Sequence, residues 1–205
     1  RNPIHNNDLQ LFPLFLCFFF RMGLIFADNY IIMANMMIKK ETRNAEKTMK
    51  AFVFDFDDTL ATTDCSVEVI FNGSVVRELT PSEFNTFELA EGESFGFNQF
   101  KDIINPVALP LTQLAIDVQS ENHNVFILSA RPVEATEAIN GFLKSIGIQA
   151  KRIICVGGKP VDIAKAKRTV LMSIIENHEV VWFFDDDDKN IEQAENISNL
   201  NVRKV

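Results

Sequence analysis

Short apolar runs alternate along the chain with segments whose apolar residues have helical spacing. The runs predict five strands: Ala51–Phe54, Val125–Leu128, Arg152–Val156, Val180–Phe184 and, at an edge, Val202–Val205. The intervening segments predict four helices: Leu111–Gln119, Pro132–Ser145, Ile163–Glu176 and Asn190–Asn196. Strands that alternate with helices indicate βαβ crossovers. We therefore expect an α/β protein with a mostly parallel sheet and helices on both of its faces.

The segment between the first two predicted strands has a different pattern. Val67–Phe71 and Val75–Leu79 flank Asn72-Gly73, a dipeptide that readily takes the positive φ values of a tight turn, so we expect a β-hairpin. Thr80–Glu83 has the residues of a helix start. Two glycines and two prolines in Glu91–Pro110 predict loops around a short helix.

The first 48 residues differ from the rest of the chain. Leu11–Phe20 is apolar but ends at Arg21, and about 20 mostly apolar residues are needed to cross a membrane. Met49 leads directly into the first strand, so we expect the functional domain to be residues 49–205. Residues 1–48 are then upstream sequence or a dispensable tail. Two alternatives stay open, a membrane anchor within residues 9–38 and a folded part of the domain.

Composition and charge narrow the classes of function. The chain has 205 residues, of which 47% are hydrophobic, and a net charge of −8. Without residues 1–48, 14 basic and 24 acidic side chains remain, a net charge of −10. An acidic domain without a basic segment does not favour stable nucleic-acid binding. The cysteines Cys17, Cys65 and Cys155 have no metal-site or disulfide spacing, so we expect a reducing, cytoplasmic location.

Polar residues follow several predicted strands at the edge where ligands bind in parallel sheets. Asp55 and Asp57 follow the first strand, Ser129 follows the second, and Asp185 and Asp186 end the fourth. One carboxylate of the first pair can attack phosphorus while the other transfers protons. Their mutual repulsion favours a divalent cation shared with the later acids, and oxygen ligands suit Mg²⁺.

Phosphoryl transfer also needs a cation from a side chain, and helical phase selects one lysine. Lys167 shares the face of Ile163 and of the apolar residues three, four, seven and eight positions later, whereas the same offsets from Lys165 reach a mostly polar face. We predict that Lys167 faces inward near the helix start, with Lys165 as the second candidate. Ser129 can donate a hydrogen bond to a phosphoryl oxygen.

With these residues in this order, the chain resembles the haloacid dehalogenase-like superfamily, chiefly its phosphatases. The first motif is Phe52-Val-Phe-Asp-Phe-Asp-Asp-Thr-Leu60, and Val125–Ser129, Lys167 and Phe183–Asp186 match the other three. The match covers Phe52 to Asn190, and the last motif is similar to that of small phosphatase-like members, including ones found in bacteriophages. The resemblance implies a Rossmann-like fold with a β-hairpin flap and a small cap at about residues 61–110.

The resemblance also implies roles for individual residues. Asp55 would be the nucleophile and a Mg²⁺ ligand, and Asp57 would be the general acid/base and bind the metal through its backbone carbonyl. Thr59 would support the first loop at the phosphate site, Ser129 and Lys167 would hold the phosphoryl group, and Asp185 would complete the metal site with Asp186 nearby. Dehalogenating members lack the second acid, so Asp57 favours phosphate esters.

Several alternatives stay open at the level of the sequence. A phospho-acceptor signalling module is disfavoured, because its acceptor lies on a later strand, where this chain has Ser129. A catalytically silent binding domain and a membrane-tethered phosphatase are the other two. A small cap leaves the site open to large substrates, so nucleotides or nucleic-acid ends are slightly favoured by analogy. The substrate and the oligomeric state are not predicted.

Overall fold

The computed structural model describes residues 36, 39–40, 49–84, 86–158 and 162–205. The chain divides into two compact units, Arg1–Glu46 and Lys47–Val205. The apolar run Leu11–Phe20 and most of the anchor segment proposed above lie outside the described residues. Among the helices that are described, none is long and apolar enough to span a membrane.

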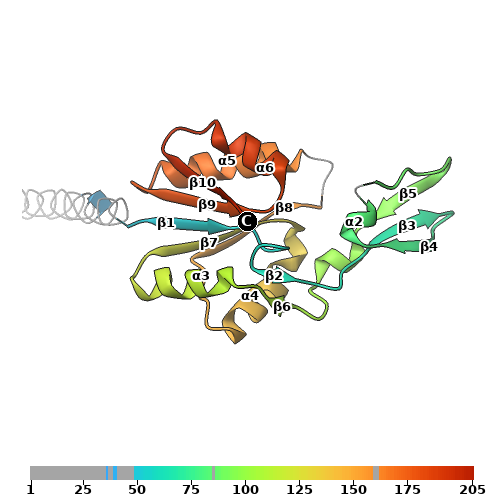
Figure 1. The fold of residues 1–205 in the computed structure, drawn as a ribbon, viewed down its shortest axis with the longest axis horizontal. Coiled ribbons are helices and arrows are strands. Elements are labelled where there is room, and N and C mark those ends of the chain that lie inside the picture. The colour runs from blue at the N-terminus through green and yellow to red at the C-terminus, as the bar shows by residue number, and fades with distance from the viewer. Residues whose placement is uncertain (1–35, 37–38, 41–48, 85, 159–161) are drawn as a thin grey trace, which may run out of the picture. The chain divides into compact units, whose positions relative to one another are not determined.

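The second unit contains a five-stranded parallel sheet, which confirms the predicted Rossmann-like α/β class (Figure 1). Its strands are β10 (Leu200–Lys204), β9 (Val181–Asp185), β1 (Ala51–Phe54), β7 (Asn124–Pro132) and β8 (Arg152–Gly157), in that spatial order. All four neighbouring pairs are parallel. Because β1 lies at the centre, the residues that follow it are flanked by the ends of β9 and β7. The predicted edge strand is present as β10.

Helices cover both faces of this sheet because side chains alternate along the strands. On one face, Phe52 and Phe54 of β1 join a buried cluster with α3 (Leu111–Ser120) and α4 (Thr136–Ser145). On the other face, Ala51 and Val53 join a cluster with α5 (Ile163–Ile175) and α6 (Asp188–Glu195). Figure 1 shows these two helix pairs on opposite sides of the sheet.

Residues 61–110 form the cap, which has a three-stranded sheet of its own. The predicted hairpin is confirmed as β3 (Val67–Phe71) and β4 (Ser74–Leu79), with positive φ values of 49° at Asn72 and 77° at Gly73. A short helix, α2 (Pro81–Phe84), follows with the reciprocal bonds of a capping box, since Glu83 accepts from Thr80 N at 2.8 Å and donates its own N–H to the Thr80 hydroxyl.

The interpretation of Glu91–Pro110 as loops around a short helix was incomplete. This segment also contains β5 (Glu93–Gly96), which pairs antiparallel with β3, and β6 (Val107–Ala108), which pairs with β2 (Ala61–Thr62). The short helix is the 3₁₀ turn η1 (Asn98–Lys101). These strands are too short for an alternation of apolar and polar residues to be visible. Their pairing depends on their partners, the hairpin strand β3 for β5 and the strand β2 after the first loop for β6.

The second predicted strand is longer than expected, and its helix begins later. β7 continues past Ser129 to Pro132 through a register shift, the short turn η2 (Val133–Ala135) follows, and α4 begins only at Thr136. The neighbouring strand β8 permits this extension because Gly157 has no side chain. A Cβ on Gly157 would lie 1.9 Å from the carbonyl oxygen of Ala130. The irregular stretch of β7 therefore requires a glycine beside it.

Candidate active site

Asp55 and Asp57 stand on a tight loop that leaves the central strand. The backbone N–H groups of Leu60 and Ala61 both donate to the carbonyl of Phe56, at 3.0 Å each. Asp58 lies between Phe56 and Leu60 and has a φ of 55°, a conformation that aspartate tolerates better than most residues. These bonds turn the chain back on itself directly after β1. The side chains of two acids are thereby held beside the carboxyl ends of β7 and β9.

Lys167 lies inside the domain, on the face of α5 that helical phase predicted. Its side chain is 1% exposed, and its ammonium donates to Asp55 Oδ1 at 2.9 Å and to Asp185 Oδ2 at 2.7 Å. Lys165 is 72% exposed and pairs with Asp162, the residue that caps α5. Burial alone lowers the pKa of Lys167, but the two carboxylates outweigh burial and raise that pKa above its usual value.

Asp185 ends β9 and is held by donors from the next turn. Its Oδ1 accepts from the N–H of Asp187 at 3.0 Å, and the amide nitrogen of Asn190 donates to both carboxylate oxygens at 3.0 and 3.2 Å. Asp187 also caps α6 by accepting from the N–H groups of Lys189 and Asn190. The sequence analysis did not identify Asn190 as part of the site; it is buried and lies in the first turn of α6.

Three of the predicted metal ligands meet at one place. Asp55, Asp185 and Asp186 can each offer an oxygen, and these oxygens lie within 4.8 Å of one another. Asp55 and Asp185 share the ammonium of Lys167, and the half-buried Asp186 adds a third carboxylate that is not bonded to this lysine. An all-oxygen donor set with this charge suits Mg²⁺. The hydrogen bonds from Asp187 and Asn190 hold the Asp185 carboxylate beside the other two acids, so the residues present fit a divalent cation.

The pKa values of two of these acids are raised, chiefly by burial. Burial raises the pKa of Asp55 to about 7; Lys167 counteracts the rise, and Asp185 and Asp57 add to it. Burial and the neighbouring Asp185 raise the pKa of Asp186 to about 6. A cation at this position would oppose both shifts, since an opposite charge nearby favours the ionised form.

The carboxylate of Asp57 is bound by an arginine that the sequence analysis did not identify. Arg131 is 2% exposed, and its Nε and Nη2 donate to the two Asp57 oxygens, both at 2.8 Å. This bidentate pair fixes the orientation of the Asp57 side chain, which remains 30% exposed to the pocket. The Asp57 side chain is thus not in the three-carboxylate group; the ligand atom predicted for it is its backbone carbonyl, and that contact stays a prediction.

Arg131 also links the first loop to the cap. Its Nη2 donates to the Thr63 hydroxyl at 2.8 Å, and its Nη1 donates to the backbone carbonyls of Phe100 and Asp102. Its guanidinium lies 5.7 Å from the ring centre of Phe56 and 5.1 Å from that of Phe100. The sequence signal was the Ser-Ala-Arg after the strand, in which Ser129 and Arg131 are buried and Ala130 is exposed.

Thr59 and Ser129 lie in the interior beside this site. Thr59 is 2% exposed, and its hydroxyl has no hydrogen-bond partner among the described residues. Ser129 is fully buried, and its hydroxyl accepts from the backbone N–H of Arg131 at 3.1 Å. Neither side chain lines the pocket described next. Their predicted roles in phosphate binding therefore stay predictions.

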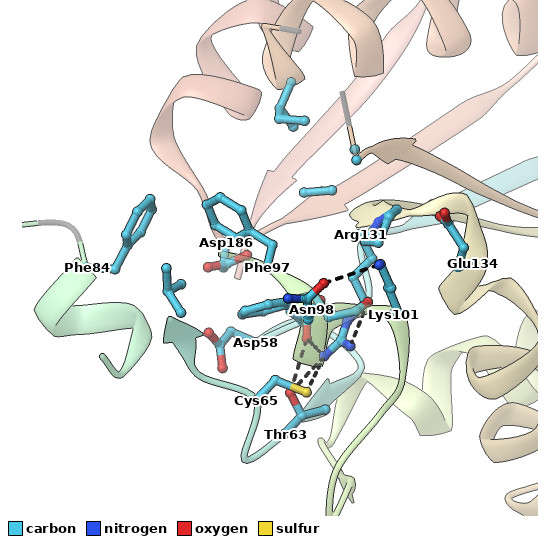
Figure 2. A pocket seen from close by; sticks show the side chains of 18 residues that line it. Asp58, Thr63, Cys65, Phe84, Phe97, Asn98, Lys101, Arg131, Glu134 and Asp186 are labelled. Carbon is cyan, nitrogen blue, oxygen red and sulfur yellow. Dashed lines mark hydrogen bonds and ion pairs between the residues drawn. The ribbon is translucent and has the colours of Figure 1, made fainter. Parts of the chain in front are cut away.

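A pocket of about 850 Å³ lies between the first loop and the cap (Figure 2). Asp57, Asp58 and Asp186 line it on the side of the parallel sheet, and Phe84, Phe97, Asn98, Phe100 and Lys101 line it from the cap. A volume of roughly 300–1,000 Å³ is typical of sites for small molecules. The pocket is therefore much larger than a phosphate group needs.

We expect Arg131→Lys to destabilise the protein by about 2 kcal/mol, because lysine cannot make the bidentate bond to Asp57 and leaves buried acceptors unsatisfied. Urea unfolding would measure this loss. Arg203→Lys is the matched control, since Arg203 is exposed and lies 5.1 Å from the Trp182 ring centre without a carboxylate partner among the described residues. Equal losses in the two variants would contradict a special role for the buried arginine.

Comparison with known proteins gives few similarities. No family model matches the chain, and no curated protein matches it. A chain of the Pnkp1/Rnl/Hen1 RNA repair complex is similar over 77% of this protein and 42% of its own length, with 16% identity and a TM-score of 0.49. A second structure of the Pnkp1/Rnl/Hen1 complex is similar over 77% and 46%, with 16% identity and a TM-score of 0.48. The protein thus spans less than half the length of either chain.

Proposed function

We propose that this protein is a Mg²⁺-dependent phosphomonoester hydrolase that forms an aspartyl-phosphate on Asp55. The observation that carries the proposal is the buried Lys167, whose ammonium bridges Asp55 and Asp185 at 2.9 and 2.7 Å. A lysine bridging two acids at the carboxyl edge of a parallel sheet stabilises an ionised nucleophile at the place where ligands bind. The charge excess of the three carboxylates supports a cation at the same place.

In the first step, a carboxylate oxygen of Asp55 attacks phosphorus. Lys167 occupies Oδ1, and Oδ2 accepts no hydrogen bond from any described residue, so Oδ2 is the available nucleophile. As the new O–P bond forms, the ester O–P bond breaks, and Asp57 protonates the leaving oxygen. The ammonium of Lys167 offsets negative charge that develops on the transferred group.

In the second step, Asp57 removes a proton from water, which attacks the phosphorus of the aspartyl-phosphate. The Asp55–phosphorus bond breaks, inorganic phosphate leaves, and Asp57 is protonated again. Arg131 keeps the Asp57 carboxylate in one orientation through both steps, because its two N–H donors bind one oxygen each. Thr59 and Ser129 would support the phosphate site next to this loop.

The carboxylates of Asp55, Asp185 and Asp186, with the backbone carbonyl of Asp57, would hold Mg²⁺. When bound, the ion supplies positive charge to the phosphoryl oxygens and aligns them with the nucleophile. The order of the motifs, similar to that of haloacid dehalogenase-like phosphatases, supports this assignment. Asp57 supports ester hydrolysis over dehalogenation, because dehalogenating members lack this acid.

The test is hydrolysis of p-nitrophenyl phosphate by the full chain. We expect turnover with Mg²⁺ that falls at least tenfold when a chelator is added and returns when excess Mg²⁺ is restored. Ca²⁺ in place of Mg²⁺ is the control for a purely structural effect, since its larger and more flexible coordination shell would hold the acids without aligning the reacting atoms. Turnover that does not depend on a divalent cation would refute the proposal.

A further inference from the structure

An exposed aromatic ring faces the pocket from the cap. Phe97 is 47% exposed, more than any other described phenylalanine, and it lines the pocket together with Phe84 and Phe100. An apolar ring that is open to water in the wall of a pocket offers area that a ligand can cover, and covering it stabilises the bound ligand. Figure 2 shows Phe84 and Phe97 in the wall of the pocket that also contains Asp58 and Asp186.

Neighbouring rings hold Phe97 in a defined orientation. Phe84 meets it edge to face, with centroids 5.8 Å apart and planes at 87°, and Phe95 and Phe100 lie 6.4 and 6.2 Å away. The guanidinium of Arg131 already lies over Phe100, 5.1 Å from its centre. Phe97 is thus the one ring of the three that is both open and supported from several sides, as a stacking platform must be.

Polar groups of the cap lie at the rim beside this ring. The Lys101 ammonium donates to the Asn98 side-chain oxygen at 3.2 Å, and both residues line the pocket. An amide and an ammonium beside a flat apolar face match a heteroaromatic ring with polar edges or a nearby second phosphate. They do not match an acyl chain, which has no polar edge to satisfy them.

We propose that Phe97 is a specificity-determining residue that stacks on the base of a nucleoside monophosphate group, either free or at the end of a strand. This inference rests on the proposed function, because it assumes that the phosphate is placed at Asp55. The pocket of about 850 Å³ has room for a base and a ribose, since Asp57 and Asp186 line it on the side of the parallel sheet and Phe97 lines it from the cap. A sugar phosphate without a base would leave the Phe97 ring uncovered.

The experiment compares adenosine 5′-monophosphate with ribose 5-phosphate, which carries the same phosphate and lacks the base. We expect kcat/KM to favour the nucleotide by on the order of tenfold or more, the scale of base stacking on an aromatic side chain. Phe97→Ala should bring the ratio close to one through KM, and Phe97→Tyr should restore it. Phe71→Ala is the matched control, since Phe71 lies in β3 of the cap, is 42% exposed and does not line the pocket.

A binding measurement separates this inference from the proposed function. Titration calorimetry with Asp55→Asn and Mg²⁺ should show tighter binding of the nucleotide than of ribose 5-phosphate, and Phe97→Ala in that background should remove the difference. If Asp55→Asn prefers the nucleotide but the wild type releases no phosphate from any substrate, the hydrolase is rejected and the base site is kept. Phosphate release without preference, or a preference that Phe97→Ala leaves intact, would overturn the base site.

Further substrates show whether the nucleoside monophosphate group comes from a free nucleotide or from the end of a nucleic-acid strand. A short oligonucleotide with a terminal phosphate that competes better than the free nucleotide would assign the site to strand ends, and the reverse order would assign it to free nucleotides. If turnover of p-nitrophenyl phosphate depended on Phe97 more strongly than turnover of adenosine 5′-monophosphate, the ring would serve simple aryl phosphates. That result would contradict the proposal.

Discussion

Asp55→Asn is expected to lower Mg²⁺-dependent phosphate release by a factor on the order of 10⁴ or more, as the loss of a nucleophile does in other hydrolases that form covalent intermediates. Asparagine has the shape of aspartate and keeps an oxygen that can accept from Lys167, so the fold should be retained. What it lacks is the anionic oxygen that attacks phosphorus. Rates with p-nitrophenyl phosphate, together with mass spectrometry of acid-quenched protein, would measure both the loss and the absence of a phosphorylated Asp55.

The matched control is Asp188→Asn, the same change at the last of the four consecutive aspartates Asp185–Asp188, whose side chain is 84% exposed. It should hydrolyse the substrate at the wild-type rate and still form the phosphorylated intermediate. If Asp55→Asn turned over as fast as Asp188→Asn, the nucleophile would have to be another residue.

Stability without metal gives a second measurement on Asp55 that does not involve activity. Burial raises its pKa from 3.8 in the unfolded chain to about 7, so the folded state binds the proton more tightly. The stabilisation associated with this proton is complete below pH 3.8 and is lost as the pH rises through about 7. In a chelator, the Tm of the wild type relative to Asp55→Asn should therefore be lower at pH 8 than at pH 5.

The placement of Lys167 and Lys165 could be predicted from the sequence because α5 is long. Its 13 residues contain enough turns for the apolar positions to define an inner face, and Lys167 falls on it. The same reasoning holds for β1 and β9, whose apolar runs end directly in acids. Regular elements with a visible apolar pattern thus place remote side chains at positions that the sequence predicts.

Arg131 could not be found in this way, because its partners lie in the first loop and in the cap. Alternation places Arg131 on the same side of β7 as Ser129, but the strand was predicted to end before both residues. It continues to Pro132 through a register shift, where Gly157 leaves room for the Ala130 carbonyl. The partners of Arg131 in the cap, Phe100 and Asp102, lie near a 3₁₀ turn that no periodic pattern marks. Contacts between an irregular strand and a short turn are tertiary, so local sequence does not encode them.

Lys167→Ala is expected to reduce both activity and stability, because it removes the only described cation that bridges the buried carboxylates of Asp55 and Asp185. Breaking a buried ion pair from one side costs about 3–5 kcal/mol, which corresponds to a fall in Tm of roughly 10 °C for a domain of this size. Lys167→Met, which fills most of the volume, separates the loss of charge from the loss of packing. Thermal unfolding in a chelator and rates with Mg²⁺ are the measurements.

Lys165→Ala provides the contrast, since Lys165 is 72% exposed on the same helix and pairs only with exposed Asp162 among the described residues. It should behave like the wild type in both measurements, and a larger loss in Lys165→Ala than in Lys167→Ala would show that the inward face of α5 has been misassigned. Mg²⁺ should raise the Tm of Lys167→Met more than that of the wild type, because the ion then supplies the positive charge that the lysine gave to the same carboxylates. If Mg²⁺ stabilised neither protein, these carboxylates would not form a cation site, and the repulsion among them would have to be relieved by protonation alone.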